Sequence, residues 1–184
     1  MPAKPCQRAS RPGFTLLEVL IVMAVAAVLA AAATPTLSAL VQRHRLVAVG
    51  RSLGADLAIA RDEAARRAVP VYLVSHAGLA DWCWALALHA QADCRGSPES
   101  DRLLIKSVHG RDHPGVQLLV AAPLVIDPRA APSAQRLGLS RLGNGAGEQL
   151  LVQLSPMGRA VLCSIGAALP GLSRCATDLP LNGS

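Results

Sequence analysis

Residues Phe14 to Ala33 form a long apolar run in which Glu18 is the only charged side chain. At about 1.5 Å of rise per residue, a helix of about twenty residues crosses the roughly 30 Å of hydrocarbon in a bilayer. A carboxylate inside that hydrocarbon costs on the order of 2 to 3 kcal/mol unless it finds a partner. The sequence therefore predicts one membrane-spanning helix whose acidic residue has a function.

A short basic leader, MPAKPCQRASRPG, precedes the run and ends at Gly13. Its positive side chains are expected to hold that end of the chain in the cytoplasm. Two simpler readings compete: an uncleaved signal anchor, and a secretory signal cut at the A-x-A sites of Ala30–Ala33. Neither gives Glu18 a role, and the cost of an unpaired acid in the membrane favours a reading that does.

The segment GFTLLEVLIV resembles the processing site of type IV prepilins and of the related type II secretion pseudopilins. This resemblance implies that a membrane-embedded prepilin peptidase cuts after Gly13 and methylates the new terminal amine on Phe14. It also implies that Glu18 pairs with the Phe14 ammonium of a neighbouring subunit in a filament. Residues 1–13 are then the leader, and residues 14–34 the transmembrane half of the N-terminal helix.

Beyond the span, Pro35 is expected to bend the helix rather than end it, because helical periodicity resumes at once. Apolar residues recur at spacings of three and four from Leu46 to Ala64. The helix is expected to run to about Arg67 and to stop before Pro70. Residues 35–68 are thus predicted to be an amphipathic half-helix that packs on the domain that follows.

Residues 69–184 change to short apolar or alternating runs separated by turns, which predicts a β-rich head. Short neighbouring strands pair most easily as antiparallel hairpins, and GNGAG reads as a hairpin turn. The expected fold class is α+β and pilin-like, a long helix packed on an antiparallel sheet. The predicted strands are Val69–Val74, Trp82–Leu88, Leu103–Val108, Val116–Ala121 with Leu124–Ile126, Leu150–Leu154 and Arg159–Ser164.

Four cysteines, Cys83, Cys94, Cys163 and Cys175, follow the span and are expected to face an oxidising compartment, whereas Cys6 lies in the leader. Four cysteines there predict two disulfides. Three pairings are open, and we favour the local ones, Cys83 with Cys94 and Cys163 with Cys175. The spacing lacks the short Cys pairs of zinc sites, so neither a metal nor a cofactor is expected.

Four downstream segments, in order and spacing, resemble the GspH/FimT family of type IV minor pilins and type II secretion pseudopilins: RLVAVGRSLGADLAIARDEAARRAVPVYL, DWCWAL, VIDPRA and LVQLSPMGRAVLC. In FimT-like pilins implicated in DNA uptake, a C-terminal Gly-Arg-x-Arg motif contacts DNA. Here Gly158 and Arg159 match, but Val161 stands where the second arginine would be. Arg159 and Arg174 are the candidate DNA contacts, and any binding is expected to be weak, salt-sensitive and sequence-blind.

An enzymatic reading has little support. His109, Asp112 and His113 lie together in HGRDH, but in a predicted loop with no activating pattern nearby. GNGAG lacks the lysine and the following helix of a phosphate-binding loop. The chain is therefore expected to be no enzyme.

The predicted function is that of a minor, FimT-like type IV pilin that aids filament initiation and assembly, with DNA uptake as an added role. The alternative is a minor H-type pseudopilin of the type II protein secretion system, and a soluble secreted binding domain comes third. Expected partners are the prepilin peptidase, other pilin or pseudopilin subunits, the inner membrane and, weakly, DNA. The protein would cross the inner membrane once with its head in the periplasm, before it enters a pilus or pseudopilus.

Overall fold

The computed structural model describes residues 13–96, 103–129, 139–155 and 158–175. The chain divides into two compact units, residues 1–38 and 39–184. The helix α1 (Leu16–Arg67) contributes to both units. The side chains of residues 33–36 are outside the description, so the predicted kink at Pro35 lies outside the described residues and stays a prediction.

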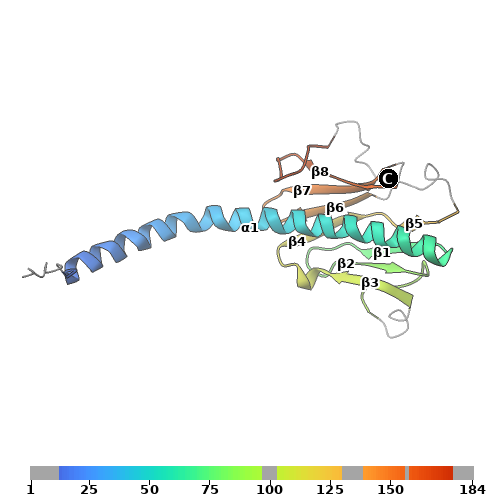
Figure 1. The fold of residues 1–184 in the computed structure, drawn as a ribbon, viewed down its shortest axis with the longest axis horizontal. Coiled ribbons are helices and arrows are strands. Elements are labelled where there is room, and N and C mark those ends of the chain that lie inside the picture. Colours follow the sequence, from blue (N-terminus) through green and yellow to red (C-terminus); the bar gives the residue numbers. More distant parts are fainter. Residues whose placement is uncertain (1–12, 97–102, 130–138, 156–157, 176–184) are drawn as a thin grey trace, which may run out of the picture. The chain divides into compact units, whose positions relative to one another are not determined.

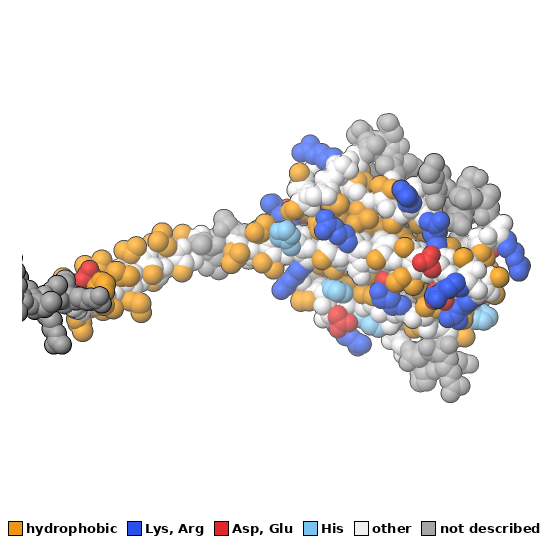
Figure 2. Space-filling view, viewed as in Figure 1, with side chains coloured by type: hydrophobic (Ala, Val, Ile, Leu, Met, Phe, Trp, Pro, Cys, Tyr) orange, Lys and Arg blue, Asp and Glu red, His pale blue; other side chains and the backbone are white. Residues whose placement is uncertain are grey.

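In the first unit, the described side chains of α1 are exposed, and apolar side chains line the face that Figure 2 shows. Phe14, just before the helix, has 83% of its surface exposed, and Leu16 has 81%. By length and composition, no single unbroken helix among the described residues is long and apolar enough to span a membrane. Among the described residues, only the pair Leu16–Ala32 and Leu37–Arg67, taken together, meets that criterion.

In the second unit, α1 is amphipathic, as its periodicity predicts, and it ends at Arg67 as expected. Its buried stripe consists of residues spaced three and four apart, which places them on one face of the helix: Leu46, Val49, Leu53, Leu57, Ala60 and Ala64. Gly50 lets the helix approach the sheet closely, since a Cβ there would lie 2.5 Å from Leu150 Cδ2. Ala68 then leaves the helix with a left-handed φ of 54°.

The strands form two antiparallel four-stranded sheets, with α1 lying against both (Figure 1). The order of the first sheet is β3-β2-β1-β5, and that of the second is β4-β6-β7-β8. A short 3₁₀ helix, η2 (Gly110–Asp112), joins β3 to β4. The strands are β1 (Val71–His76), β2 (Cys83–Ala87), β3 (Leu104–His109), β4 (Val116–Ala121), β5 (Leu124–Ile126), β6 (Leu139–Asn144), β7 (Gln149–Leu154) and β8 (Ala160–Ile165).

The α+β, pilin-like fold class is confirmed, with two corrections. The single sheet that we expected is two sheets, and the strand β6 was not predicted at all. The segment LSRLGN has buried polar side chains, Ser140 and Asn144, which hide the apolar alternation of a strand. The GNGAG hairpin turn is present between β6 and β7, although Gly143 and Asn144 belong to the strand.

The core between α1 and the first sheet contains both tryptophans. The rings of Trp82 and Trp84 stack with their centroids 5.1 Å apart. Each indole N–H has a buried acceptor: Trp82 donates to the carbonyl of Val116 at 2.7 Å, and Trp84 donates to Asp56 Oδ2 of α1 at 2.8 Å. Lys106 of β3 also donates to the Asp56 carboxylate, so this acid joins the helix to two strands of the sheet.

Two disulfides close loops within the second unit. The structure pairs Cys83 with Cys94 and Cys163 with Cys175, which is the local pairing that we favoured. The second bond holds the segment after β8 against that strand, where Ser164 and Arg174 form an isolated parallel bridge. Each disulfide closes a loop of only eleven or twelve residues, so neither bond links distant parts of the chain.

Candidate functional site

The predicted processing segment precedes the first turn of α1. Gly13, Phe14 and Thr15 are not helical, and Thr15 caps the helix, because its hydroxyl oxygen accepts a hydrogen bond from the backbone N–H of Glu18 at 3.2 Å. Thr15 and Glu18 have the spacing of a capping box. A carboxylate in the first turn also interacts favourably with the helix dipole. The Glu18 carboxylate therefore stabilises the first turn of α1.

The apolar side chains that follow Glu18 form an exposed surface. All described side chains from Phe14 to Ala32 are exposed. A surface of this kind is stable in hydrocarbon or packed against other apolar helices, because exposing it to water costs roughly 25 cal/mol per Å². The segment is thus built to be buried by lipid or by neighbouring helices.

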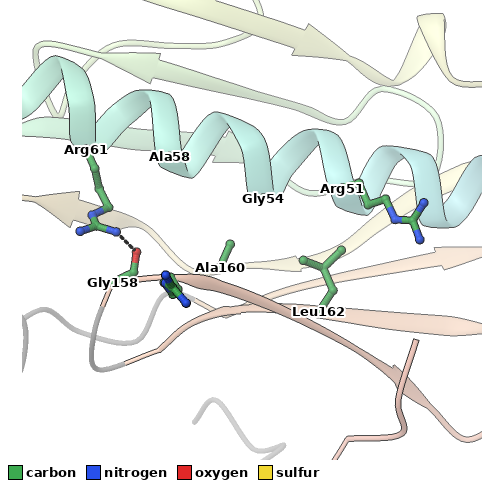
Figure 3. Close-up of a pocket in the computed structure, with 8 residues that line it drawn as sticks. Arg51, Gly54, Ala58, Arg61, Gly158, Ala160 and Leu162 are labelled. Atoms are coloured by element: carbon green, nitrogen blue, oxygen red, sulfur yellow. Dashed lines mark hydrogen bonds between the residues drawn. The ribbon is translucent and has the colours of Figure 1, made fainter. Parts of the chain in front are cut away.

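A second candidate site is a groove of about 420 Å³ between α1 and β8 (Figure 3). Its helical wall has small residues in the middle and arginines at the ends, and its other wall is the start of β8. Of the predicted contacts, Arg159 lies here, whereas Arg51 and Arg61 were not predicted. The lining residues are Arg51, Gly54, Ala58, Arg61, Gly158, Arg159, Ala160 and Leu162.

The helical wall arises from spacing. Arg51, Gly54, Ala58 and Arg61 follow one another at intervals of three, four and three, so they share one face of α1. Gly54 brings the helix close to β8, since a Cβ there would lie 3.3 Å from Leu162 Cδ1 and 3.4 Å from the Ala160 Cβ. The small side chains in the middle leave the groove open between the two arginines.

The turn that leads into β8 holds Arg159 in place. The N–H of Arg159 donates to Ser155 Oγ at 3.0 Å, and the N–H of Ser155 donates to the Arg159 carbonyl at 2.8 Å. Arg61 Nη1 donates to the carbonyl of Gly158 at 2.6 Å, which ties this turn to the helix (Figure 3). Gly158 has a φ of +72°, and a Cβ there would lie 3.0 Å from Arg61 Cζ, so glycine is required.

The structure does not bring the two predicted DNA contacts into one groove. Arg174 lies beside Ser164, near the other end of β8, and is not part of the groove lining. Val161, which replaces the second arginine of the Gly-Arg-x-Arg motif, is 40% exposed. The groove therefore combines Arg159 with two helix arginines rather than with Arg174.

Two known sequence families match this chain, one at the N-terminal helix and one over most of the second unit. Residues 8–34 match the prokaryotic N-terminal methylation motif, and residues 49–158 match the family described as Type II transport protein GspH. The chain belongs to the GspH family. Searches of curated proteins and of solved structures give no significant match.

Membership of the GspH family confirms the predicted relationship to minor pilins and pseudopilins, which are structural and not enzymatic proteins. The methylation motif covers Gly13, Phe14 and Glu18, and it implies processing by a prepilin peptidase. The family implies other pilin-type subunits as partners, and the apolar N-terminal helix implies an inner-membrane anchor before assembly.

The two histidines of HGRDH lie at the end of β3 and just after η2. His109 ends β3, and the next three residues form η2. The ring of His113 stacks on Trp82, with centroids 5.9 Å apart. Among the described residues, no group of three or more His, Cys, Asp or Glu side chains is placed to hold a metal ion.

Sequence reasoning missed Arg51 and Arg61 because each looks like an ordinary solvent-facing residue of an amphipathic helix. The available signal was the run Arg51, Gly54, Ala58, Arg61, in which small residues interrupt the polar face. It also missed Asp56, whose carboxylate is buried although the residue type is usually exposed.

Proposed function

We propose that this GspH-family protein is a minor type IV pilin that enters a pilus through α1 and helps to initiate filament assembly. The observation that carries the proposal is the exposed apolar helix, with a capped first turn, directly after the Gly13-Phe14 processing motif. Cleavage after Gly13 and methylation of Phe14 prepare the subunit. The apolar helix then passes from lipid to the packed helices of the filament.

In this proposal, Glu18 selects the position of the subunit in the filament. A charge within hydrocarbon is stabilised strongly by an opposite charge, and the new terminal ammonium of Phe14 on a neighbouring subunit is such a charge. Among the described residues, no ion pair joins Glu18 to a side chain of its own chain. This leaves its carboxylate to be neutralised by another subunit.

The first test is the identity and methylation state of the amino-terminal residue. The protein is recovered from membranes of cells with and without the prepilin peptidase and read by mass spectrometry. An N-methylated Phe14 that appears only with the peptidase is expected. A start near Thr34 would instead indicate a secretory signal peptidase, and the whole filament proposal would be withdrawn.

The second test separates charge from capping at Glu18. Glu18→Gln keeps a side chain suited to the capping box but removes the charge, and Glu18→Ala removes both. Both variants are expected to be processed and to have a folded second unit, yet to enter filaments poorly. Asp62→Ala, which removes an exposed acid from the same helix, is the control. Normal incorporation of Glu18→Gln would disprove the pairing of charges.

The alternative is an H-type minor pseudopilin of type II secretion, which the matched family, Type II transport protein GspH, favours. Both roles use the same processing site and the same apolar helix. Deletion of the gene distinguishes them: loss of pili and twitching with normal protein export supports the pilus, and the reverse pattern supports secretion. We do not include DNA uptake in the proposal, because Val161 replaces the second arginine and Arg174 lies outside the groove.

A further inference from the structure

Among the described residues, β8 is an edge strand, and part of its outer backbone has no pairing strand. It is the last strand in the order β4-β6-β7-β8, so only one of its edges pairs with β7. On its outer edge, the N–H of Ser164 donates to the Ser173 carbonyl at 2.9 Å, and the N–H of Cys175 donates to the Ser164 carbonyl at 3.0 Å. Backbone groups alternate along a strand, so those of Ala160 and Leu162 point to this same edge.

The Cys163–Cys175 disulfide fixes the position of the segment that is bound to Ser164. Across the described part of the chain, no backbone group pairs with the outward N–H and C=O of Ala160 and Leu162. An edge of this kind accepts an additional strand, because backbone hydrogen bonds are formed without any change in the sheet. This part of β8 borders the arginine groove, since Ala160 and Leu162 also line it.

The groove carries positive charge that the described residues do not neutralise. Arg61 uses Nη1 to hold the Gly158 carbonyl, which fixes its guanidinium at one end. Among the described side chains, no carboxylate pairs with Arg51 or Arg159. A guanidinium binds a carboxylate with two parallel hydrogen bonds, so the groove suits an acidic side chain.

The dimensions fit a short extended segment. Arg51 and Arg61 are ten residues apart, which is about 15 Å along a helix. A β-strand rises about 3.3 Å per residue, so about four or five residues pass between the arginines. We propose that the edge of β8 and this groove together bind an extended acidic segment of a partner subunit as an added antiparallel or parallel strand.

The same features favour a peptide over a nucleic acid. A peptide backbone supplies both donors and acceptors for Ala160 and Leu162, whereas a phosphodiester backbone supplies acceptors alone. No aromatic side chain is among the described residues that line the groove, so bases have no surface on which to stack. Between the arginines the helical wall is small and apolar at Gly54 and Ala58, which leaves room for the side chains two residues before and after the acid, on the same face of the strand.

The test measures binding of a defined probe to the full chain in detergent micelles. The probe is the N-acetylated amide of the extended hexapeptide Val-Thr-Val-Asp-Val-Thr, followed by fluorescence anisotropy. Two matched probes accompany it: the peptide with Asn in place of Asp, and the peptide with N-methylated backbone amides. Both changes are expected to weaken binding by about tenfold, because each removes one of the two modes of recognition.

Variants of the protein locate the site. Arg159→Ala and Arg51→Ala are each expected to weaken binding of the acidic peptide by about tenfold, and Arg159→Lys to restore part of it. Arg111→Ala, an exposed arginine outside the groove lining, is expected to change nothing. Near-ultraviolet circular dichroism checks that each variant keeps its tryptophan packing.

Several outcomes would overturn the site: no binding of the acidic peptide at about 1 mM, equal binding of the N-methylated peptide, or equal binding by Arg159→Ala. Tighter, arginine-dependent binding of an oligothymidine strand would instead assign the groove to nucleic acid. The assignment of the partner as another pilin-type subunit rests on the proposed function. The peptide assay is independent of processing at Gly13, so failure of the groove leaves the amino-terminal test of the function intact, and the reverse also holds.

Discussion

The carboxylate of Asp56 on α1 accepts a hydrogen bond from the indole nitrogen of Trp84 on β2, at 2.8 Å, in a fully buried setting. Lys106 of β3 reaches the other oxygen of the same carboxylate. A buried charge with two donors is stabilised, but removal of one member leaves the others without partners. This contact therefore determines how firmly the first sheet is attached to the helix.

Replacement of this acid tests that attachment. Asp56→Ala is expected to lower the free energy of unfolding by about 2 to 4 kcal/mol, because the Trp84 indole N–H loses a buried acceptor. Asp62→Ala, an exposed acid on the same helix, is the matched control and is expected to change stability by less than about 0.5 kcal/mol. Urea unfolding of the full chain, followed by tryptophan fluorescence, measures both. Equal effects of the two changes would contradict the assignment.

The end of α1 offers a stabilising substitution. Ala68 has a φ of 54°, which costs a residue with a side chain about 1 kcal/mol relative to glycine. Ala68→Gly is therefore expected to raise the stability by about that amount. Ala65→Gly, three residues earlier on an exposed position of the helix, is expected to lower it by about 1 kcal/mol. Thermal unfolding of the two variants should move in opposite directions, and a shared sign would refute the interpretation.

The turn before β8 requires glycine at position 158. Gly158→Ala combines a left-handed φ of +72° with a contact of 3.0 Å to Arg61 Cζ, so a loss of about 1 to 2 kcal/mol is expected. Gly145→Ala, at the β6–β7 turn, has nothing within 4 Å of the added methyl group and no positive φ. It serves as the control in the same urea titration. If both substitutions proved neutral, the turn would not be held as the structure has it.

Glu63 gives a prediction for pH. The hydrogen bond from Arg67, and then the charges of Arg66 and Arg67, lower the pKa of the Glu63 carboxyl below its usual value. A lowered pKa in the folded state means that this pair adds stability above the unfolded pKa and loses it as the pH falls through the folded pKa. Arg67→Ala is expected to raise the pKa of Glu63, as followed by carbon-detected NMR titration. Arg111→Ala should leave that pKa in place.

The spacing of apolar residues along the chain was sufficient to predict the long helix and several of the strands. The stripe from Leu46 to Ala64 has the period of a helix, and β4 and β5 occupy the residues expected for them. The processing segment was readable because its features are contiguous in sequence. The helix, these strands and the processing segment each depend on residues that are close together in the sequence, so the sequence alone predicts them.

The features that were missed depend on contacts between distant residues. The strand β6 has polar side chains at buried positions, and it is held in its sheet by pairing with β4 on one side and β7 on the other. The groove exists only because Gly54 of α1 meets Ala160 and Leu162, more than a hundred residues later. The spacing of apolar residues does not show which distant segments come into contact, so it could predict neither β6 nor the arginine groove.

The apolar stripe of α1 has a consequence for the order in which this protein is made. The stripe comes first along the chain, whereas Leu150, which packs against Gly50, comes a hundred residues later. The apolar stripe is therefore exposed on the growing chain long before the strand that covers it has been synthesised. Translation speed, and whatever shields nascent helices at the membrane, then become determinants of the yield of folded protein.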